Sequence, residues 1–313
     1  MAGIGTQLLI EFVQLLNELR QGSITPLAID SFRALSRPIV SNDSVLPPTE
    51  LFSTRHEVER ANSTRLASLQ SPPVTFDARD SGSAAPEKRK AVLANMRVPE
   101  RLILKKGAQV MLVKNIDDQR GLVNGAVGRV LGFFAAPRGK SEGVITNVEI
   151  SEDGKSVVFA GEAKENLKPG STVPVKTPNN EGKKPATGAT ELFPLVEFPT
   201  PTGKERTLVT RDEFRIEDNE GVVLARRVQA CYPVVLQLPC SITCMRYQVP
   251  LILAWAISIH KSQGQTIQRV KVDLGRVFEK GQSYVALSRA ATMDGLQVLR
   301  FDPKKVPFSF CLR

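Results

Sequence analysis

Leu251-Ile-Leu-Ala-Trp-Ala-Ile-Ser-Ile-His-Lys-Ser-Gln-Gly-Gln-Thr266 is the stretch that decides the fold of this 313-residue chain. Residues 251–256 predict a buried β-strand, because the run is short and apolar. Ser258 is placed to cap a helix containing residues 260–265, since a serine oxygen can accept a free N–H at a helix start. A buried strand followed at once by a polar helix start is typical of α/β proteins.

A second informative block is Gly281-Gln-Ser-Tyr-Val-Ala-Leu-Ser-Arg-Ala290. Residues 283–290 predict a helix, and the flanking apolar runs predict strands over 270–274 and 296–301. Strands that alternate with helices require a parallel sheet with crossover helices. The C-terminal part of the chain is therefore predicted to be α/β.

The N-terminal part is predicted to be helical. Leu8, Phe12, Leu15 and Leu19 recur at helical spacing, and Gly22 is placed to end that helix. A second short helix is expected over 27–35, before Pro38.

A strand-to-helix turn is predicted in Leu51-Phe-Ser-Thr-Arg-His-Glu-Val-Glu-Arg-Ala-Asn62. Thr54 and Glu57 have the spacing of a capping box, with Thr54 as the N-cap of a helix. The side chains expected to face the core from this helix are Val58, Ala61, Leu66 and Leu69. Turns of this kind are where α/β folds place ligands.

The middle of the chain changes to a β pattern. Residues 108–113 predict a strand, and Asn124-Gly125 between apolar pairs predicts a tight hairpin. Residues 135–207 are rich in Pro, Gly, Lys and Thr, which indicates a loop-rich insertion with short strands near 144–150 and 156–160. No single conformation is predicted for 175–190.

Composition narrows the class of partner. The formal net charge is +10 and the pI is near 9.6, which favours a polyanion such as nucleic acid, although charge that only keeps a protein soluble is the alternative. Four cysteines in so long a chain indicate a reducing, intracellular setting. Cys240 and Cys244 have a spacing that resembles a zinc site, but with only His56 and His260 elsewhere no metal site is predicted.

A membrane partner is not expected. No apolar run approaches the ~20 residues that span a bilayer. The first helical segment carries Glu11 and Glu18, which argues against a secretory signal or an Arg-rich transit peptide.

Four blocks together carry a resemblance to a known family. They are residues 51–62, Leu104-Lys-Lys-Gly-Ala-Gln-Val-Met-Leu-Val-Lys-Asn115 with Gly121-Leu-Val-Asn-Gly125, and the two blocks quoted first. In this order they resemble the C-terminal half of a Pif-family DNA helicase of superfamily 1B. The resemblance implies an α/β fold, namely a RecA-like P-loop-NTPase-type second motor domain with an inserted small SH3-like β-barrel.

The resemblance also implies a domain organisation. Residues 1–40 would be the tail of a first RecA-like domain with a linker, and 41–103 the first part of the second RecA-like domain. Residues 104–246 would form the SH3-like 2B domain with its long insertion. Residues 247–313 would complete the second RecA-like domain.

Arg289 carries the main catalytic hypothesis. By resemblance it is an arginine finger, a guanidinium that stabilises charge on the transferring γ-phosphoryl group. Arg55, Gln263 and Gly264 are implied as nucleotide-binding residues, with Arg55 beside a helix N-terminus that suits an anion. Both arginines could instead be ordinary solvated side chains, and the residues alone favour that alternative for Arg289.

The DNA-binding residues implied by the resemblance are Thr54, His260, Lys261, Ser262 and Thr266. Donors at a helix start can hold a DNA phosphate, and Lys261 adds positive charge. Trp255 and Tyr284 could stack on bases, but both lie in apolar runs, so core packing is favoured.

A phosphate-binding loop is not found in these 313 residues. Gly139-Lys140-Ser141 lacks the required glycine five positions earlier, where Phe134 stands, and Gly203-Lys204 is followed by Glu205. ATP and Mg²⁺ are therefore expected only in combination with a first RecA-like domain, and this chain alone is expected to hydrolyse nothing.

The leading hypothesis is a part of a 5′-to-3′ DNA helicase that binds single-stranded DNA. It is expected to be a monomer, and a separate first RecA-like domain is a candidate partner. The alternatives are a non-catalytic DNA- or protein-binding module derived from a helicase, and an incomplete gene model of a full helicase. Nucleus or mitochondrion is the compartment that the resemblance implies.

Overall fold

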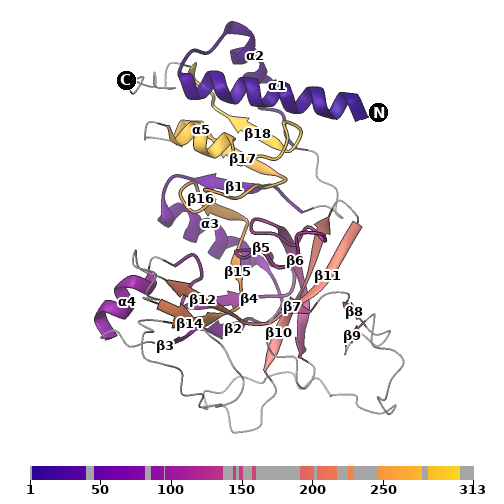
Figure 1. Cartoon of the computed structure of the whole chain (residues 1–313), viewed down its shortest axis with the longest axis vertical. Coiled ribbons are helices and arrows are strands. Elements are labelled where there is room, and N and C mark those ends of the chain that lie inside the picture. The colour runs from indigo at the N-terminus through magenta and orange to yellow at the C-terminus, as the bar shows by residue number, and fades with distance from the viewer. Residues whose placement is uncertain are drawn as a thin grey trace.

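The computed structural model describes most of the chain outside the insertion. The described residues are 2–39, 46–81, 86–94, 96–136, 144–145, 148–150, 157–159, 191–200, 203–216, 225–227, 245–276 and 281–303. They form a parallel sheet with helices, at one end of the molecule, and a set of antiparallel sheets at the other (Figure 1). The Cys240 and Cys244 pair, the Gly139-Lys140-Ser141 string and residues 175–190 lie outside the described residues.

The parallel sheet has the strand order β16-β1-β17-β18. All three neighbouring pairs run parallel, and Leu51 in the middle lies between Ile257 and Val272. Its strands are β16 (Ala256–Ser258), β1 (Thr49–Phe52), β17 (Val270–Asp273) and β18 (Leu296–Leu299). Because the strands are parallel, their carboxyl ends share one edge, where open α/β sheets bind ligands.

Helices surround this sheet, as the sequence predicted. They are α1 (Ala2–Gln21), α2 (Pro26–Ala34), α3 (Arg55–Ser68), α5 (Gln282–Leu287) and the 3₁₀ turn η1 (Leu274–Arg276). One core cluster joins Phe12, Leu19 and Phe32 of the first two helices to apolar strand residues including Ile257, Val272 and Val298. Gly22 follows α1 with φ +70°, which confirms its predicted position at the helix end.

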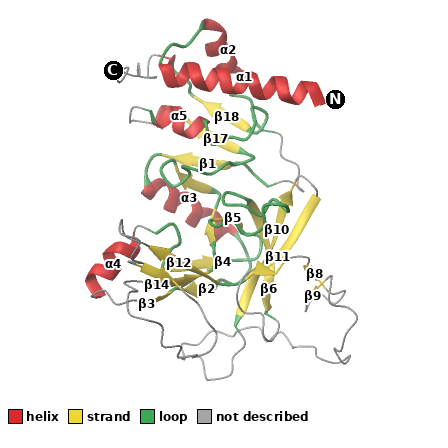
Figure 2. Ribbon diagram, viewed as in Figure 1, coloured by secondary structure: helices red, strands yellow, loops and turns green. Residues whose placement is uncertain are grey.

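The antiparallel part, whose strands lie in the lower half of the view in Figure 2, is built around a sheet of order β15-β5-β6-β10-β11-β7. Its strands are β15 (Leu251–Leu253), β5 (Gln109–Leu112), β6 (Val127–Ala135), β10 (Leu192–Thr200), β11 (Gly203–Val209) and β7 (Val144–Ile145). Its core contains Leu104, Val110, Leu112, Val196 and Phe198, all fully buried. Trp255 packs there and Tyr284 packs on the other core, which confirms the predicted packing roles.

Smaller sheets complete this part. One has the order β13-β12-β14-β3, one pairs β2 with β4, and one pairs β8 with β9. The elements are β2 (Val74–Asp77), β3 (Arg79–Ser81), α4 (Pro86–Ala94), β4 (Arg101–Leu104), β8 (Val148–Ile150), β9 (Val157–Phe159), β12 (Asp212–Ile216), β13 (Ala225–Arg227) and β14 (Met245–Gln248). The short strands expected within the insertion near 144–150 and 156–160 are thus present.

One predicted strand proved to be two. Residues 251–256 were expected to form a single strand, but β15 pairs antiparallel with β5, whereas β16 pairs parallel with β1. The break falls at Ala254, whose N–H donates to the Gln109 carbonyl at 2.9 Å. The chain therefore crosses from one sheet to the other inside the apolar run, and both halves are apolar because both pack against core clusters.

Three further predictions need correction. Residues 260–265 form consecutive turns and not a helix, and α5 ends at Leu287, so Arg289 lies in the turn after it. Asn124-Gly125 is a turn, but the ladder joins β5 to β6, so it lies within a longer connection. Bonds between Ile116, Asp117 and Leu122 fill that connection and replace the short strand expected before the turn.

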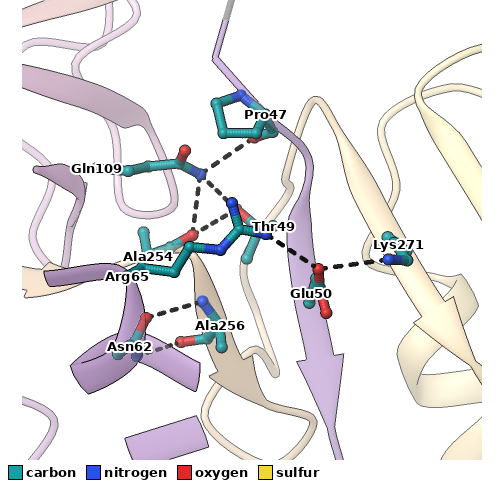
Figure 3. A network of polar contacts seen from close by, with 9 residues as sticks. All are labelled: Pro47, Thr49, Glu50, Asn62, Arg65, Gln109, Ala254, Ala256 and Lys271. Carbon is teal, nitrogen blue, oxygen red and sulfur yellow. Dashed lines mark hydrogen bonds and ion pairs between the residues drawn. The ribbon is translucent and has the colours of Figure 1, made fainter. Parts of the chain in front are cut away.

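The inward face of α3 also differs from the prediction. Its expected core residues are only half-buried, and the buried one is Asn62, at 7% exposure. The Asn62 amide donates to the Ala256 carbonyl at 2.8 Å and accepts from the Ala256 N–H at 3.0 Å (Figure 3). Since β16 is an edge strand, α3 supplies the hydrogen bonds that a further strand would otherwise make.

Candidate functional site

The loop that follows β16, residues 259–266, carries most of the predicted site residues. Ser258 organises its start: its hydroxyl accepts from the Lys261 N–H at 3.3 Å and its carbonyl from the Ser262 N–H at 3.1 Å. Further on, the Gln265 N–H donates to the Ser262 carbonyl at 3.1 Å. These bonds close a compact loop, so the predicted capping role of Ser258 is confirmed for one turn although no helix follows.

Side chains of this loop divide into buried and exposed sets. Ser262 is fully buried and its hydroxyl donates to the Ile259 carbonyl at 2.7 Å, so it shapes the loop from inside. The exposed members are His260, Lys261, Gln263, Gly264 and Thr266. Gly264 has φ +72° with nothing near the position of a Cβ, so backbone conformation and not crowding favours glycine there.

The start of α3 lies beside this loop. The Ile259 N–H donates to the carbonyl of Phe52, the last residue of β1, at 2.9 Å. Thr54 is the N-cap of α3 with extended backbone, and its hydroxyl oxygen accepts from the Glu57 N–H at 3.4 Å and donates to the Glu57 carboxylate at 2.8 Å. The predicted cap is confirmed, and it places Arg55 in the first turn with an exposed side chain.

Lys261 and Arg55 are close enough to affect each other electrostatically. Desolvation and then the charge of Arg55 lower the pKa of the Lys261 ammonium, and Glu59 raises it in smaller measure. Two cations therefore gather beside the N-terminus of a 14-residue helix. The free N–H groups and dipole of a helix N-terminus add further positive potential, so the arrangement suits an anion such as a phosphate.

Arg289 lies in a different setting. Its Nε donates to the Val285 carbonyl at 3.0 Å and its Nη2 to the Ser288 hydroxyl at 2.8 Å, so the guanidinium lies against the C-terminal end of α5. Its backbone carbonyl accepts from the Ile267 N–H at 2.8 Å, which ties it to the residue just after the loop. The structure brings Lys261, Arg55 and Thr54 together, whereas the contacts of Arg289 named above are with α5 and Ile267.

Sequence reasoning missed the residues that hold the loop from outside. Arg97 Nη2 donates to the Gln263 carbonyl at 3.2 Å, and Gln265 Nε2 donates to the Asn124 side-chain oxygen at 3.0 Å. No local pattern identifies either contact, because each joins residues far apart in the chain. Asn62 had a usable signal, since it lies at helical spacing between Val58 and Leu66.

Neither a metal site nor a membrane-spanning helix is found among the described residues. They contain no group of three or more His, Cys, Asp or Glu side chains that could hold a metal ion. Of the helices described, none has the length and apolar character that crossing a membrane requires.

Comparisons with known proteins place this geometry in a family. A family profile described as DNA helicase Pif1, 2B domain, matches residues 88–133. Over 299 residues the chain is 45% identical to the ATP-dependent DNA helicase PIF1 of Emericella nidulans, covering 95% of this chain and 36% of that protein. The chain belongs to the Pif1 helicase family. It spans about a third of the length of the curated Pif1 relatives that it matches.

Solved Pif1 structures share the fold. The crystal structure of Pif1 from Candida albicans has a TM-score of 0.56 and 34% identity, covering 95% of this chain and 54% of that one. Bacteroides sp Pif1, described in complex with ADP-AlF4, has a TM-score of 0.56 at 19% identity, covering 95% of this chain and 50% of that one. Bacteroides Pif1 is also described as bound to single-stranded DNA.

These matches confirm the predicted fold class. The parallel sheet is RecA-like, and the antiparallel part contains the Pif1 2B domain. The predicted domain limits stay predictions. β15, at 251–253, pairs with β5 in the six-stranded antiparallel sheet, which we call the 2B sheet because β5 lies within the residues that match the 2B profile. It does so although it follows the limit proposed at 246–247.

Proposed function

We propose that this chain is the second motor domain and 2B domain of an ATP-dependent 5′-to-3′ DNA helicase, and that it binds single-stranded DNA. The observation that carries the proposal is that the loop with Lys261 lies beside the start of α3, where the Ile259 N–H donates to the Phe52 carbonyl and Arg55 occupies the first turn, on the edge where the parallel strands end. Two cations and a helix N-terminus form a site for phosphate, which both DNA and ATP present. The family membership supports both ligands.

The DNA-facing roles belong to Thr54, His260, Lys261 and Thr266. Lys261 supplies the charge that holds a backbone phosphate, and the exposed His260 and Thr266 flank it on the same loop. The resemblance implies a DNA contact for Ser262 as well, but its buried hydroxyl is bonded within the loop, so we assign it the role of fixing the loop shape.

The nucleotide-facing roles belong to Arg55, Gln263, Gly264 and Arg289. Arg55 would hold a phosphate oxygen beside the helix N-terminus, and the Gly264 backbone allows close approach. Arg289 would act as the arginine finger, stabilising charge that develops on the transferring phosphoryl group. Its guanidinium now bonds Val285 and Ser288, so it must leave these partners to reach a nucleotide.

ATP hydrolysis would require a first RecA-like domain in addition to these residues. Phosphoryl transfer needs a phosphate cradle, a metal ion and a positioned water together. The 313 residues contain no Gly-x-x-x-x-Gly-Lys-Ser/Thr string, so the cradle, and Mg²⁺ with it, would come from that domain. DNA binding needs no such partner, and it is the activity expected of this chain by itself.

The direct test is fluorescence anisotropy of a labelled single-stranded oligonucleotide titrated with the chain. Lys261→Gln should weaken binding about ten-fold, the loss expected for one charge-assisted contact. It should also reduce the slope of log K against log salt by about 0.7, since one phosphate contact fewer is made. Lys106→Gln removes the same charge from an exposed position of the antiparallel part and serves as the matched control.

Equal behaviour of Lys261→Gln and Lys106→Gln would overturn the DNA site. A second measurement addresses turnover: phosphate release by the chain alone, with ATP and single-stranded DNA, is expected to stay at background. Clear turnover that Arg289→Ala abolishes would contradict the need for a first RecA-like domain. If the chain binds DNA but no ATP hydrolysis appears, even when a first RecA-like domain is added, a binding module would be favoured.

A further inference from the structure

The connection between β5 and β6 touches the candidate loop through the Asn124-Gly125 turn. Gln265 Nε2 donates to the Asn124 side-chain oxygen at 3.0 Å. Gly125 has φ +101°, and a Cβ at this position would lie 3.0 Å from the Thr266 carbonyl oxygen and 3.3 Å from the Gln265 Cβ. Glycine is therefore required both for the backbone conformation and for the close approach of the two chain segments.

The turn is itself held firmly by the 2B sheet. The Asn124 N–H donates to the Asn115 side-chain oxygen at 2.8 Å, and the Gly125 N–H donates to the Leu112 carbonyl at 2.9 Å. Leu112 belongs to β5, whose four residues are all buried. The contact surface offered to the loop is thus an extension of a buried strand, and we expect it to move little on its own.

The Gln265 side chain depends on this contact. Gln265 is 2% exposed, and its Oε1 has no hydrogen-bond partner among the described residues. Within that part of the chain, Asn124 is the partner that satisfies its amide. Loss of that partner would leave a buried amide unpaired, which is costly enough that the side chain should turn to water and carry the loop with it.

A displacement at Gln265 would reach Lys261 by a short path. The Gln265 N–H bonds the Ser262 carbonyl, and the Ser262 N–H bonds the Ser258 carbonyl, so Lys261 lies inside the same chain of hydrogen bonds. Arg97 bonds the Gln263 carbonyl from the 2B side, so the loop is contacted on both sides of Gly264. The loop conformation that presents Lys261 is therefore set from outside as well as by its own turns.

We infer that Asn124 and Gly125 of the 2B domain are positioning residues for the DNA-phosphate site of the second motor domain. They touch no DNA in this scheme; they hold residues 259–266 in the conformation that presents Lys261. This inference rests on the proposed function, because it requires that the loop bind DNA. If it holds, the affinity of the motor domain for DNA depends on an uncharged contact made by a different domain.

The salt dependence of single-stranded DNA binding tests the inference. Asn124→Ala removes no charge, yet it should lower the slope of log K against log salt by about 0.7, as Lys261→Gln does, because the phosphate contact is lost. Affinity should fall about three- to ten-fold, the worth of one hydrogen bond. Gln119→Ala, an exposed neutral position in the same β5–β6 connection, is the matched control and should leave both quantities unchanged.

The double variant Asn124→Ala with Lys261→Gln separates positioning from a general loss of structure. If Asn124 acts through Lys261, the double variant should bind like Lys261→Gln alone, with no further fall in slope or affinity. Additive losses would overturn the inference, and so would an unchanged salt slope in Asn124→Ala. If Asn124→Ala does not fold, as judged by its thermal transition, Gln265→Ala breaks the same hydrogen bond from the other side and must give the same result.

The two proposals fail in different ways. If Lys261→Gln binds DNA as the unaltered chain does, the proposed DNA site is wrong, whatever Asn124→Ala does. If Lys261→Gln weakens binding and lowers the slope while Asn124→Ala and Gln265→Ala do neither, the DNA site stands and the positioning role is wrong.

Discussion

Two groups of polar contacts differ in burial: those made to Pro47, Ala254 and Ala256 near the start of β16, which we call the edge contacts, and those in the loop after β16. At the edge, Asn62, Gln109 and Thr49 are buried, and their bonds go to backbone groups of Ala254, Ala256 and Pro47 (Figure 3). In the loop, His260 and Lys261 are exposed, and the backbone beneath them is bonded. The edge contacts hold the sheets, whereas the loop keeps its charge available to a ligand.

Asn62→Ala should give the largest effect on stability. It would leave the N–H and the carbonyl of Ala256, which is 1% exposed, without the partners that α3 provides. Each unsatisfied buried backbone group costs about 1–3 kcal/mol, so we expect the free energy of unfolding to fall by about 2–4 kcal/mol. Urea denaturation followed by circular dichroism measures it.

Ser63→Ala supplies the matched control for that variant. Ser63 is the next residue of α3 and is exposed, and alanine suits a helix slightly better than serine does. Its replacement should therefore change the free energy of unfolding by less than about 0.5 kcal/mol. Equal effects of the two substitutions would show that α3 does not complete the sheet edge through Asn62.

Gln109→Ala should have the next largest effect, because Gln109 links the two kinds of sheet. From β5 its Nε2 donates to the Ala254 carbonyl at 3.0 Å and the Pro47 carbonyl at 3.2 Å, and it lies 3.4 Å from the Thr49 hydroxyl. Thr49 still donates to the Ala254 carbonyl at 2.9 Å, so that carbonyl keeps one partner. We expect a loss of about 2 kcal/mol, below that of Asn62→Ala.

The unfolding curve of Gln109→Ala carries a second, sharper readout. If Gln109 ties the parallel sheet to the 2B sheet, its removal should broaden or split the urea transition, because the two parts then unfold less cooperatively. Gln119→Ala, exposed in the same region, should keep both the midpoint and the shape. A Gln109→Ala transition as stable as that of Gln119→Ala would refute the link.

The same comparison explains how far sequence could go. The N-cap at Thr54, the helix end at Gly22 and strand β17 follow from local chemistry, and each was predictable from neighbouring residues. The apolar run from Leu251 was not separable into β15 and β16, because its division depends on pairing with β5 and β1, which lie far away in sequence. Hydrophobicity reports burial and does not report which sheet a strand joins.

The candidate site shows a similar limit. The family resemblance identified the loop and Arg55, and the structure places the loop beside the start of α3, where Arg55 lies. Burial of Ser262 and the bonds of the Arg289 guanidinium depend on backbone turns that the string His-Lys-Ser-Gln does not encode by itself. The sequence predicts only a turn at Asn124, because an asparagine in a turn gives no sign that its side-chain oxygen also accepts from a distant partner such as Gln265.

The smallest expected effect concerns the exposed member of the comparison, Lys261, and its response to pH. Its pKa is lowered by desolvation and by Arg55, so it loses its charge at a lower pH than an ordinary lysine, whose pKa is about 10.4. In the interval between the folded and unfolded pKa values the unfolded chain binds more protons, so this residue makes the free energy of unfolding rise with pH there.

The affinity for DNA changes with pH in the opposite direction, because a phosphate favours the charged form of Lys261. Affinity for an oligo-deoxyadenylate should therefore weaken as pH rises through the alkaline range, whereas Lys261→Arg, which stays charged, should hold its affinity. Anisotropy at fixed salt measures both pH profiles, and profiles of the same shape for the unaltered chain and Lys261→Arg would show that Lys261 does not carry the contact.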